Sequence, residues 1–450
     1  MSLLRTYIEE LRAAAIMHST RIMVSGGKNI ASAATEPALA RGPATEQLPG
    51  LVAVNGRPAL GKQPHLVIVV TSGLITTFFR GQIAHLCQAG FRVTFICKPG
   101  PETAAVKAEG AEVIAVPLER EIALLQDARC LWKLWRTLRR LKPDITNVGT
   151  PKAGLLGGIA ARVAGVRCRI YTIHGLRLET ASGWKRRLLT LTERISCANA
   201  HHVRCVGPSL RQRAIDLALV NPDKAYVVAS GSSNGLDCER FLRTPERIAA
   251  AHALRRKLGI PEDSPVIGFV GRLVRDKGIR ELCAAYQMLK RDFADLQLLL
   301  VGDFEEGDPV DASVRSALVA DSNVHLFGMV ADAAPYYPLM DVVALPTYRE
   351  GFPNVPREAA AAGVPVVTTT ATGAVDSVVE GITGRLVPPR DEAALAAALK
   401  DVLNAPDRGR RMGRAGEEWV RARFRQELVW DALVADYRKV LNGASARRAD

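Results

Sequence analysis

The chain has 450 residues, too many for one ordinary hydrophobic core and about right for two domains of roughly 150 residues with additional segments. Its composition, 48% hydrophobic and 24% charged with 37 Gly and 25 Pro, excludes collagen-like, coiled-coil and largely disordered proteins. The net charge of +14 belongs to the first half: residues 1–250 carry 34 Lys or Arg and 18 Asp or Glu, whereas residues 251–450 carry 26 and 28. A basic half predicts a polyanionic partner, either nucleic acid or anionic lipid. The alternative is that the excess positive charge simply lies on the solvated faces of helices.

The first 64 residues do not read as a folded domain. Glu9 and Glu10 fall where a secretory signal needs an uncharged core, so we expect a cytoplasmic protein. Residues 25–64 are rich in Ala, Gly and Pro without apolar periodicity, which predicts a disordered extension over 1–64 and a fold that begins at His65. No apolar run reaches the roughly 20 residues of a membrane span. The eight cysteines never form a CxxC pair and predict buried, reduced thiols.

From His65 onwards, short apolar runs alternate with amphipathic helical segments. This alternation predicts a parallel, doubly wound sheet over residues 65–235, the first lobe. The expected strands are 66–70, 91–97, 111–118, 144–148, 166–173, 200–206 and 225–229, and the expected helices are 79–89, 101–109, 124–141, 151–164, 184–197 and 209–219.

Two of these helices carry indole and basic side chains beside an apolar stripe. Trp132 and Arg136 border the stripe of the segment 124–141, and Trp184 is followed by three basic residues. Indoles beside a basic rim suit an anionic membrane interface, whereas ordinary crossover helices packed on a sheet are the structural alternative. With 5% aromatic residues and no zinc-finger, basic-zipper or RNA-recognition pattern, we expect no nucleic-acid partner.

The segment 231–241, GSSNGLDCERF, lacks periodicity and is the expected connection between domains. Apolar runs then resume and predict a second doubly wound lobe over residues 236–424. The expected strands are 265–271, 296–302, 324–328, 342–346, 364–369 and 384–388, and the expected helical stretches are 393–403 and 408–440. We expect the last helix, 425–441, to pack back on the first lobe, and ligands to bind beyond the carboxyl ends of the strands.

The loop after the strand 342–346 carries the strongest chemical signal. Glu350 and Gly351 lie in a polar turn, and an Ala-rich helix with Glu358 in its first turns follows. Free N–H groups of Asn354 and Val355 would form an anion site at the helix start. Two carboxylates eight residues apart could accept hydrogen bonds from hydroxyl groups on both sides of a diphosphate. Alternatively, Glu358 could simply stabilise the start of the helix through the helix dipole.

Three further loops carry candidate residues. After the strand 265–271, Gly271, Arg272 and Lys277 are suited to neutralising a leaving diphosphate, with solvated surface charges as the alternative. Gly73 follows the first strand and could let a phosphate approach closely. His174 ends another strand before a glycine and is expected to open on the cleft between the lobes.

With these motifs the chain resembles the retaining glycosyltransferases of family 4, which have the two-lobed GT-B fold. The resemblance covers nearly all of residues 65–440. Its motifs are EGFPNVPRE from Glu350 to Glu358, GRLVRDKG at 271–278, GSSNGLD at 231–237 and GTPKAG at 149–154. It implies an α/β protein with two Rossmann-like lobes facing each other across a cleft.

The resemblance also implies roles for single residues. Glu350 would contact donor-sugar hydroxyls, Glu358 the nucleotide ribose, and the strand end 327–330 the base. The implied catalytic residues are His174, Arg272, Lys277 and Glu350. The implied donor-binding residues are Gly73, Gly271, Val330, Gly351, Phe352, Pro353, Asn354, Val355 and Glu358. The family needs no metal, and the acidic segment DFEEGD at 303–308 is expected to cap a helix.

Within the family the chain is most similar to bacterial enzymes that extend polyprenyl-diphosphate-linked oligosaccharides for capsule, exopolysaccharide or O antigen. This implies a hexose or N-acetylhexosamine donor, UDP-linked, with no further cofactor, and a lipid-linked saccharide acceptor. A peripheral location on the inner face of the cytoplasmic membrane follows. Because no first-lobe carboxylate stands out as a nucleophile, we expect the acceptor to attack on the face that the diphosphate leaves.

Two other functions remain open on the sequence alone. A nucleotide-sugar epimerase would need acid and base carboxylates from the first lobe, where residues 51–100 contain neither Asp nor Glu. A non-catalytic scaffold would bind polyanions or membranes through the basic half. Turnover of a UDP-sugar without an acceptor identifies the epimerase, and liposome sedimentation compared with DNA retention, both over a salt series, tests the scaffold.

Overall fold

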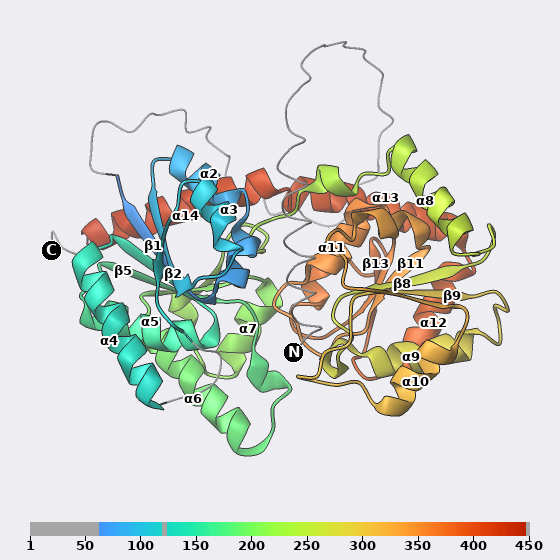
Figure 1. Ribbon diagram of the computed structural model, residues 1–450, viewed down its shortest axis with the longest axis horizontal. Helices are drawn as coiled ribbons and strands as arrows, with labels where there is room; N and C mark the ends of the chain where they lie inside the picture. Colours follow the sequence, from blue (N-terminus) through green and yellow to red (C-terminus); the bar gives the residue numbers. More distant parts are fainter. Residues whose placement is uncertain (1–62, 119–123, 447–450) are drawn as a thin grey trace, which may run out of the picture. The chain divides into compact units, whose positions relative to one another are not determined.

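The computed structural model describes residues 63–118 and 124–446 (Figure 1). The expected disordered extension over 1–64 therefore lies almost wholly outside the described residues. The described residues belong to one compact unit, which contains two separate parallel sheets. The expected pair of doubly wound sheets is confirmed.

The first lobe is built on seven parallel strands in the order β3-β2-β1-β4-β5-β6-β7. β1 lies at the centre with Leu66 beside Val93 of β2 on one side and beside Ile145 of β4 on the other. The strand order reverses at this point, so the loops after β1 and β4 diverge where ligands bind in open sheets. The strands are β1 His65–Ser72, β2 Arg92–Lys98, β3 Glu112–Ala115, β4 Ile145–Gly149, β5 Cys168–Ile173, β6 His202–Cys205 and β7 Ala225–Val227.

The helices of the first lobe follow the expected alternation with one difference. In place of one helix over 79–89 there is a 3-10 helix, η1, Gly73–Phe79, and then α2, Gln82–Gln88. The break falls at Gly81, whose φ of 80° is left-handed and whose missing Cβ leaves room for the Trp430 ring. The remaining helices are α3 Thr103–Ala108, α4 Leu124–Leu141, α5 Pro151–Val163, α6 Gly183–Asn199 and α7 Pro208–Asp216.

The second lobe is built on six parallel strands in the order β10-β9-β8-β11-β12-β13. β8, β9, β11 and β12 are buried throughout, as continuous apolar runs between two helical layers should be. The strands are β8 Val266–Val270, β9 Gln297–Val301, β10 Val324–Gly328, β11 Val342–Leu345, β12 Val366–Thr369 and β13 Gly384–Val387. The helices are α8 Pro245–Lys257, α9 Ile279–Leu289, α10 Ala312–Ala320, α11 Asn354–Ala361 and α12 Glu392–Leu403.

The C-terminal helical stretch is divided in two rather than continuous over 408–440. α13, Pro406–Arg423, packs with α11 and α12, and α14, Gln426–Ala446, packs with α2 and β5 of the first lobe (Figure 1). Phe424 at the break is buried, and its ring packs against Phe352 and Trp419. Its carbonyl accepts from the Leu236 N–H at 2.7 Å, so the two chain crossings between the lobes lie side by side.

Candidate active site at the ends of β5, β8 and β11

The loops after β5 and β11 meet closely, and at Gly351 only a glycine fits. A Cβ on Gly351 would overlap the His174 carbonyl oxygen, and a Cβ on Gly175 would lie 3.5 Å from the Gly351 nitrogen. His174 follows β5 of the first lobe and Gly351 follows β11 of the second. The carboxyl ends of strands from both sheets therefore face one another here, at the position expected for a ligand.

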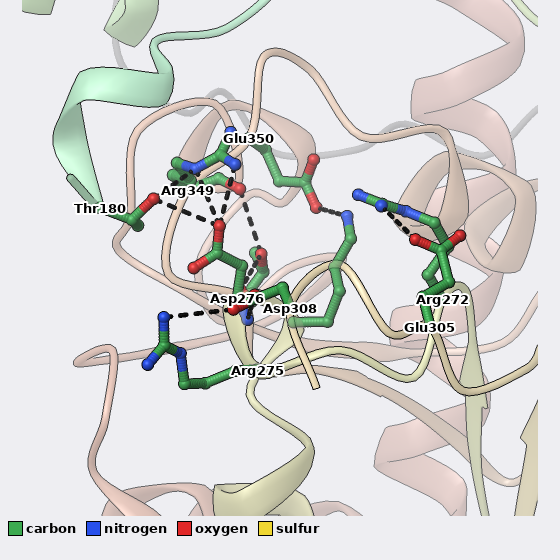
Figure 2. A network of polar contacts seen from close by, with 10 residues as sticks. Thr180, Arg272, Arg275, Asp276, Glu305, Asp308, Arg349 and Glu350 are labelled. Carbon is green, nitrogen blue, oxygen red and sulfur yellow. Dashed lines mark hydrogen bonds and ion pairs between the residues drawn. The ribbon is translucent and has the colours of Figure 1, made fainter. Parts of the chain in front are cut away.

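Lys277 and Glu350, two residues singled out in the sequence, form an ion pair in this region (Figure 2). Both side chains are largely shielded, with 19% and 14% of their surface exposed. Lys277 ends the short 3-10 helix η5, Arg275–Lys277, after which Gly278 adopts a left-handed φ of 74°. A Cβ on Gly278 would overlap the Pro346 carbonyl oxygen. This glycine therefore lets the loop that carries Lys277 lie directly against the loop that carries Glu350.

Arg272 lies at the rim of the same region and is more than half exposed. Its guanidinium pairs with Glu305 at 2.8 Å. The acidic segment 303–308 does not cap α10, which Asp311 precedes, but its Asp308 accepts a backbone N–H from the first turn of the 3-10 helix η5. Asp308 pairs with Arg275 and accepts from the Asp276 N–H at 2.9 Å (Figure 2). Gly271, with a φ of 139°, joins β8 to this loop.

Glu358 lies on α11 behind the ion pair and is fixed by an aromatic hydroxyl. The Tyr337 hydroxyl donates to Glu358 Oε2 at 2.7 Å. Burial raises the pKa of Glu358, and the Tyr337 hydrogen bond opposes that rise. Val330, expected near a nucleobase, is half-buried and packs on the same apolar cluster as Tyr337.

The loop between Glu350 and Glu358 is held by Arg357, which the sequence analysis did not single out. Its guanidinium is buried and donates to the carbonyls of Phe352 and Pro353, to Asn354 Oδ1 and to Ser232 Oγ. It also lies 4.4 Å from the centre of the Phe352 ring. An arginine inside an otherwise Ala-rich buried helix was the available signal. Arg357 therefore fixes the backbone that the expected donor-binding residues share.

Asn354 and Val355 open α11, as expected, with Pro353 before them. The side chain of Asn354 is engaged by Arg357, so its contribution to an anion site would come from its backbone N–H. Gly73 follows β1, and a Cβ there would lie 2.7 Å from the Gly100 nitrogen, so this glycine allows the loops after β1 and β2 to pack closely.

His174 is accessible to solvent, and its Nδ1 lies 3.1 Å from Ser233 Oγ. Although the ring is accessible, protein surrounds it on most sides. This desolvation, together with the nearby Arg204 guanidinium, lowers the pKa of His174 to about 4. The imidazole is therefore neutral at pH 7 and acts as a hydrogen-bonding group.

Direct hydrogen bonds join the two lobes around the ion pair, and the sequence pattern gave no sign of them. Glu179 Oε1 accepts from Thr372 Oγ1 at 2.8 Å, and Ser209 Oγ donates to Asp376 Oδ2 at 2.7 Å. Glu179 Oε2 is buried without a hydrogen-bond partner among the described residues. Closing the lobes thus gains some hydrogen bonds and leaves one carboxylate oxygen unsatisfied.

Within residues 63–118 and 124–446, no group of three His, Cys, Asp or Glu side chains is arranged to hold a metal ion. In the same part of the chain, no helix combines the length and apolar character that a membrane span requires.

Comparisons with known proteins agree with this geometry. Residues 251–419 match the family model described as "Glycosyl transferases group 1", and residues 75–231 match a "Glycosyl transferase 4-like domain". The chain is 36% identical over 383 residues to a capsular polysaccharide biosynthesis glycosyltransferase, CapM, of Staphylococcus aureus, covering 85% of this chain and 98% of CapM. It is 27% identical over 287 residues to an Escherichia coli UDP-Gal:alpha-D-GlcNAc-diphosphoundecaprenol alpha-1,3-galactosyltransferase, covering 63% of this chain and 72% of that protein.

Solved structures resemble the fold across most of its length. Anabaena Alr3699/HepE in complex with UDP has a TM-score of 0.67 at 21% identity, covering 84% of this chain and all of that chain. Sucrose-phosphate synthase from Thermosynechococcus elongatus has a TM-score of 0.69 at 22% identity with the same coverage.

Proposed function

The chain belongs to the group 1 glycosyltransferases, of the family 4 type with the GT-B fold, and we propose that its substrates are a UDP-linked sugar and a polyprenyl-diphosphate-linked saccharide. A hexose or N-acetylhexosamine would move between them in the synthesis of capsule, exopolysaccharide or O antigen. The family match favours transfer over the epimerase and scaffold alternatives. The observation that carries the proposal is the shielded Lys277–Glu350 pair at the facing strand ends.

The relatives support the choice of substrates. CapM is named for capsular polysaccharide biosynthesis, and the E. coli relative is named for a UDP-galactose donor and a diphosphoundecaprenol-linked acceptor. HepE binds UDP. We propose the same classes of donor and acceptor for this chain.

In the proposed complex the donor diphosphate contacts Arg272 and Lys277. The Arg272–Glu305 pair is largely exposed, so exchanging Glu305 for a phosphate oxygen costs little. Lys277 would move its ammonium from Glu350 towards the diphosphate, and Glu350 would accept hydroxyls of the sugar. Glu358 retains acceptor capacity for ribose hydroxyls beside its Tyr337 hydrogen bond. The backbone around Phe352 and Asn354, fixed by Arg357, would meet sugar and phosphate.

Transfer proceeds with retention in this proposal. The bond between the anomeric carbon and the phosphate oxygen breaks, and UDP leaves with the electron pair. The acceptor hydroxyl oxygen attacks the anomeric carbon on the face that UDP leaves, and its proton passes to the departing phosphate. Lys277 and Arg272 stabilise the developing negative charge, each contact contributing about 2.7–4 kcal/mol by analogy with oxyanion donors.

A panel of UDP-glucose, UDP-galactose, their N-acetylamino counterparts and GDP-mannose tests the donor, with undecaprenyl-diphosphate-linked N-acetylglucosamine as the acceptor. We expect one UDP-sugar to raise the melting temperature and to release UDP only when the acceptor is present. Conversion of a UDP-sugar without acceptor would support the epimerase, and transfer from GDP-mannose alone would overturn the UDP assignment.

We further propose that α4 and α6 bind the anionic surface of the inner leaflet. Trp132 on α4 and Trp184 on α6 are 52% and 76% exposed, among exposed basic side chains. The basic side chains concerned are Arg129, Lys133, Arg136, Arg139, Arg140, Lys185, Arg186 and Arg187. Exposed indoles beside basic groups favour an interfacial position.

Sedimentation with phosphatidylglycerol and phosphatidylcholine vesicles over a salt series tests this surface. We expect binding to the anionic vesicles only, weakened by salt and by Trp132→Ala with Trp184→Ala. The matched control removes two exposed apolar side chains of the second lobe, Met329→Ala with Ile382→Ala. Binding to neither vesicle would remove the membrane proposal, and binding to DNA instead would favour the polyanion scaffold.

A further inference from the structure

The segment after β5 docks directly on the loops that carry the ion pair. Thr180 of this segment donates to Asp276 Oδ2 at 3.2 Å and accepts from Arg349 Nε at 2.8 Å. Arg349 and Asp276 pair with each other at 2.9 Å. One hydroxyl from the first lobe therefore completes a charged pair that belongs to the second lobe (Figure 2).

This charged pair lies next to the Lys277–Glu350 pair along both chain segments. Asp276 immediately precedes Lys277, and Arg349 immediately precedes Glu350. Each ion pair therefore joins the same two chain segments, and Figure 2 shows Glu350 close to the Arg349–Asp276 pair. A rotation of either loop that broke one pair would displace the other, because each pair shares its backbone with its neighbour.

Backbone contacts tie the two loops together at the same point. The Asp276 carbonyl accepts from the Tyr348 N–H at 2.9 Å and from Thr347 Oγ1 at 3.2 Å. The Glu350 N–H donates at 2.9 Å to the carbonyl of Thr372, whose hydroxyl contacts Glu179 of the first lobe. The first lobe is thus connected through these hydrogen bonds to both ends of the segment 347–350, which carries Glu350.

We propose that Thr180 is a positioning residue that couples docking of the first lobe to the geometry of the Lys277–Glu350 pair, through Asp276 and Arg349. The inference rests on the proposed role of that pair in donor binding and transfer. With the lobes apart, Asp276 and Arg349 would keep their direct ion pair but lose the hydroxyl that contacts both of them. With the lobes docked, the hydroxyl holds both groups and so fixes the residues that follow them.

A threonine hydroxyl suits this position because it donates and accepts at once. It donates to the carboxylate and accepts from the guanidinium, and hydrogen bonds to charged groups are the stronger kind. A cavity of about 530 Å³, bordered by Thr180 and Asp276, reaches the contact. Water from this cavity can take the place of the hydroxyl when the lobes separate, which makes the docking reversible.

Three variants of the full chain test the proposal. Thr180→Val keeps the shape and removes the hydroxyl, and Thr180→Ser restores a hydroxyl. Thr190→Val is the matched control, because among the described residues the Thr190 hydroxyl bonds the Arg186 carbonyl of its own helix, at 2.8 Å, and no other group. The values of kcat and KM are measured with the nucleotide sugar that the donor panel identifies. Titration with UDP gives the affinity of the donor site.

We expect Thr180→Val to lower kcat about tenfold while UDP affinity changes by less than about twofold. Thr180→Ser should recover most of the loss, and Thr190→Val should resemble the native protein. Amide hydrogen exchange with UDP bound gives a readout independent of turnover: the Tyr348 and Glu350 amides should exchange faster in Thr180→Val alone.

Two results would overturn the proposal. One is a Thr180→Val protein with native kcat and native exchange, and the other is a Thr180→Ser protein as impaired as Thr180→Val. A native protein that binds no UDP and transfers no sugar would instead contradict the proposed function. The exchange measurement on the UDP-free chain would then still decide whether Thr180 orders the two loops.

Discussion

At the scale of single residues, the structure separates groups that would touch substrate from groups that hold them. Lys277 and Glu350, which we propose to contact the diphosphate and the sugar hydroxyls, are shielded and paired with each other. Arg357 is equally charged but entirely buried, and its donors are used on the loop backbone. The same residue type at 272 is exposed and free to exchange its partner.

The first prediction concerns Lys277. Lys277→Ala should lower kcat by about 100-fold to 1,000-fold, because it removes a charge that acts on the departing diphosphate. UDP affinity should fall much less. Lys290→Ala is the control, since that lysine pairs with Asp321 away from the site. Weaker UDP binding with an unchanged kcat would show that Lys277 only binds the donor.

The second prediction concerns the buried Glu193, which accepts from the Tyr171 hydroxyl at 2.7 Å. Burial raises the pKa of Glu193 to about 7, against a smaller lowering by that hydrogen bond. The folded protein then binds a proton that the unfolded chain has released, so this group costs stability progressively as pH rises from about 4.5 to about 7.

Glu193→Gln removes this titration. Relative to the native protein, the variant should gain unfolding free energy between pH 5 and pH 8, by about 3 kcal/mol. Urea unfolding at several pH values measures the difference. A difference that does not change with pH would show that Glu193 is ionised in the folded protein.

At the scale of elements, the positions of the strands and most helices were predictable, because each strand is a buried apolar run and each crossover helix has an amphipathic face. Predictions failed where a contact distant in sequence decides the local conformation. Gly81 divides a helix to accommodate Trp430, and Phe424 ends α13 by packing on Phe352. Such partners lie more than 70 residues away in the chain, beyond the reach of local periodicity.

The third prediction concerns the anchoring of α14 on the first lobe. Asp436 pairs with the buried Arg204, and the neighbouring Tyr437 hydroxyl accepts from Asn147 at 3.0 Å. Asp436→Asn would leave a buried guanidinium without its counter-ion and should lower the unfolding free energy by about 3 kcal/mol. On the same helix, Asp431 is 61% exposed and pairs with His85, so Asp431→Asn should cost less than about 1 kcal/mol. Equal effects in denaturant unfolding would contradict this anchoring.

At the scale of the whole molecule, the two lobes approach each other through glycines. The sequence placed Glu350, Lys277 and His174 at strand ends of separate sheets, which was enough to predict a shared site. The contacts of Thr180 and Ser209 with the second lobe could not be predicted, because isolated hydroxyl residues leave no pattern. The basic excess was visible in the charge count, and part of it lies on α4 and α6, whose exposed basic side chains accompany the exposed Trp132 and Trp184.

The fourth prediction tests the approach of the lobes. Gly351→Ala would place a methyl group against the His174 carbonyl and should hold the lobes apart. We expect kcat to fall at least about tenfold while the melting temperature stays within a few degrees of native. Gly443→Ala is the control, because within the described part of the chain no atom outside the local backbone of its own helix lies within 4 Å of a Cβ there. Native turnover in Gly351→Ala would show that this contact is not needed for transfer.

The most direct test of the whole account is the anomeric configuration of the product. The chain, the UDP-sugar selected by the panel and the undecaprenyl-diphosphate-linked acceptor are incubated together, and the new linkage is assigned from its anomeric proton coupling. We predict an α-linked product from an α-linked donor, formed by the native protein and lost in Lys277→Ala. A β-linked product, or transfer that persists unchanged in Lys277→Ala, would contradict the proposed site and its mechanism.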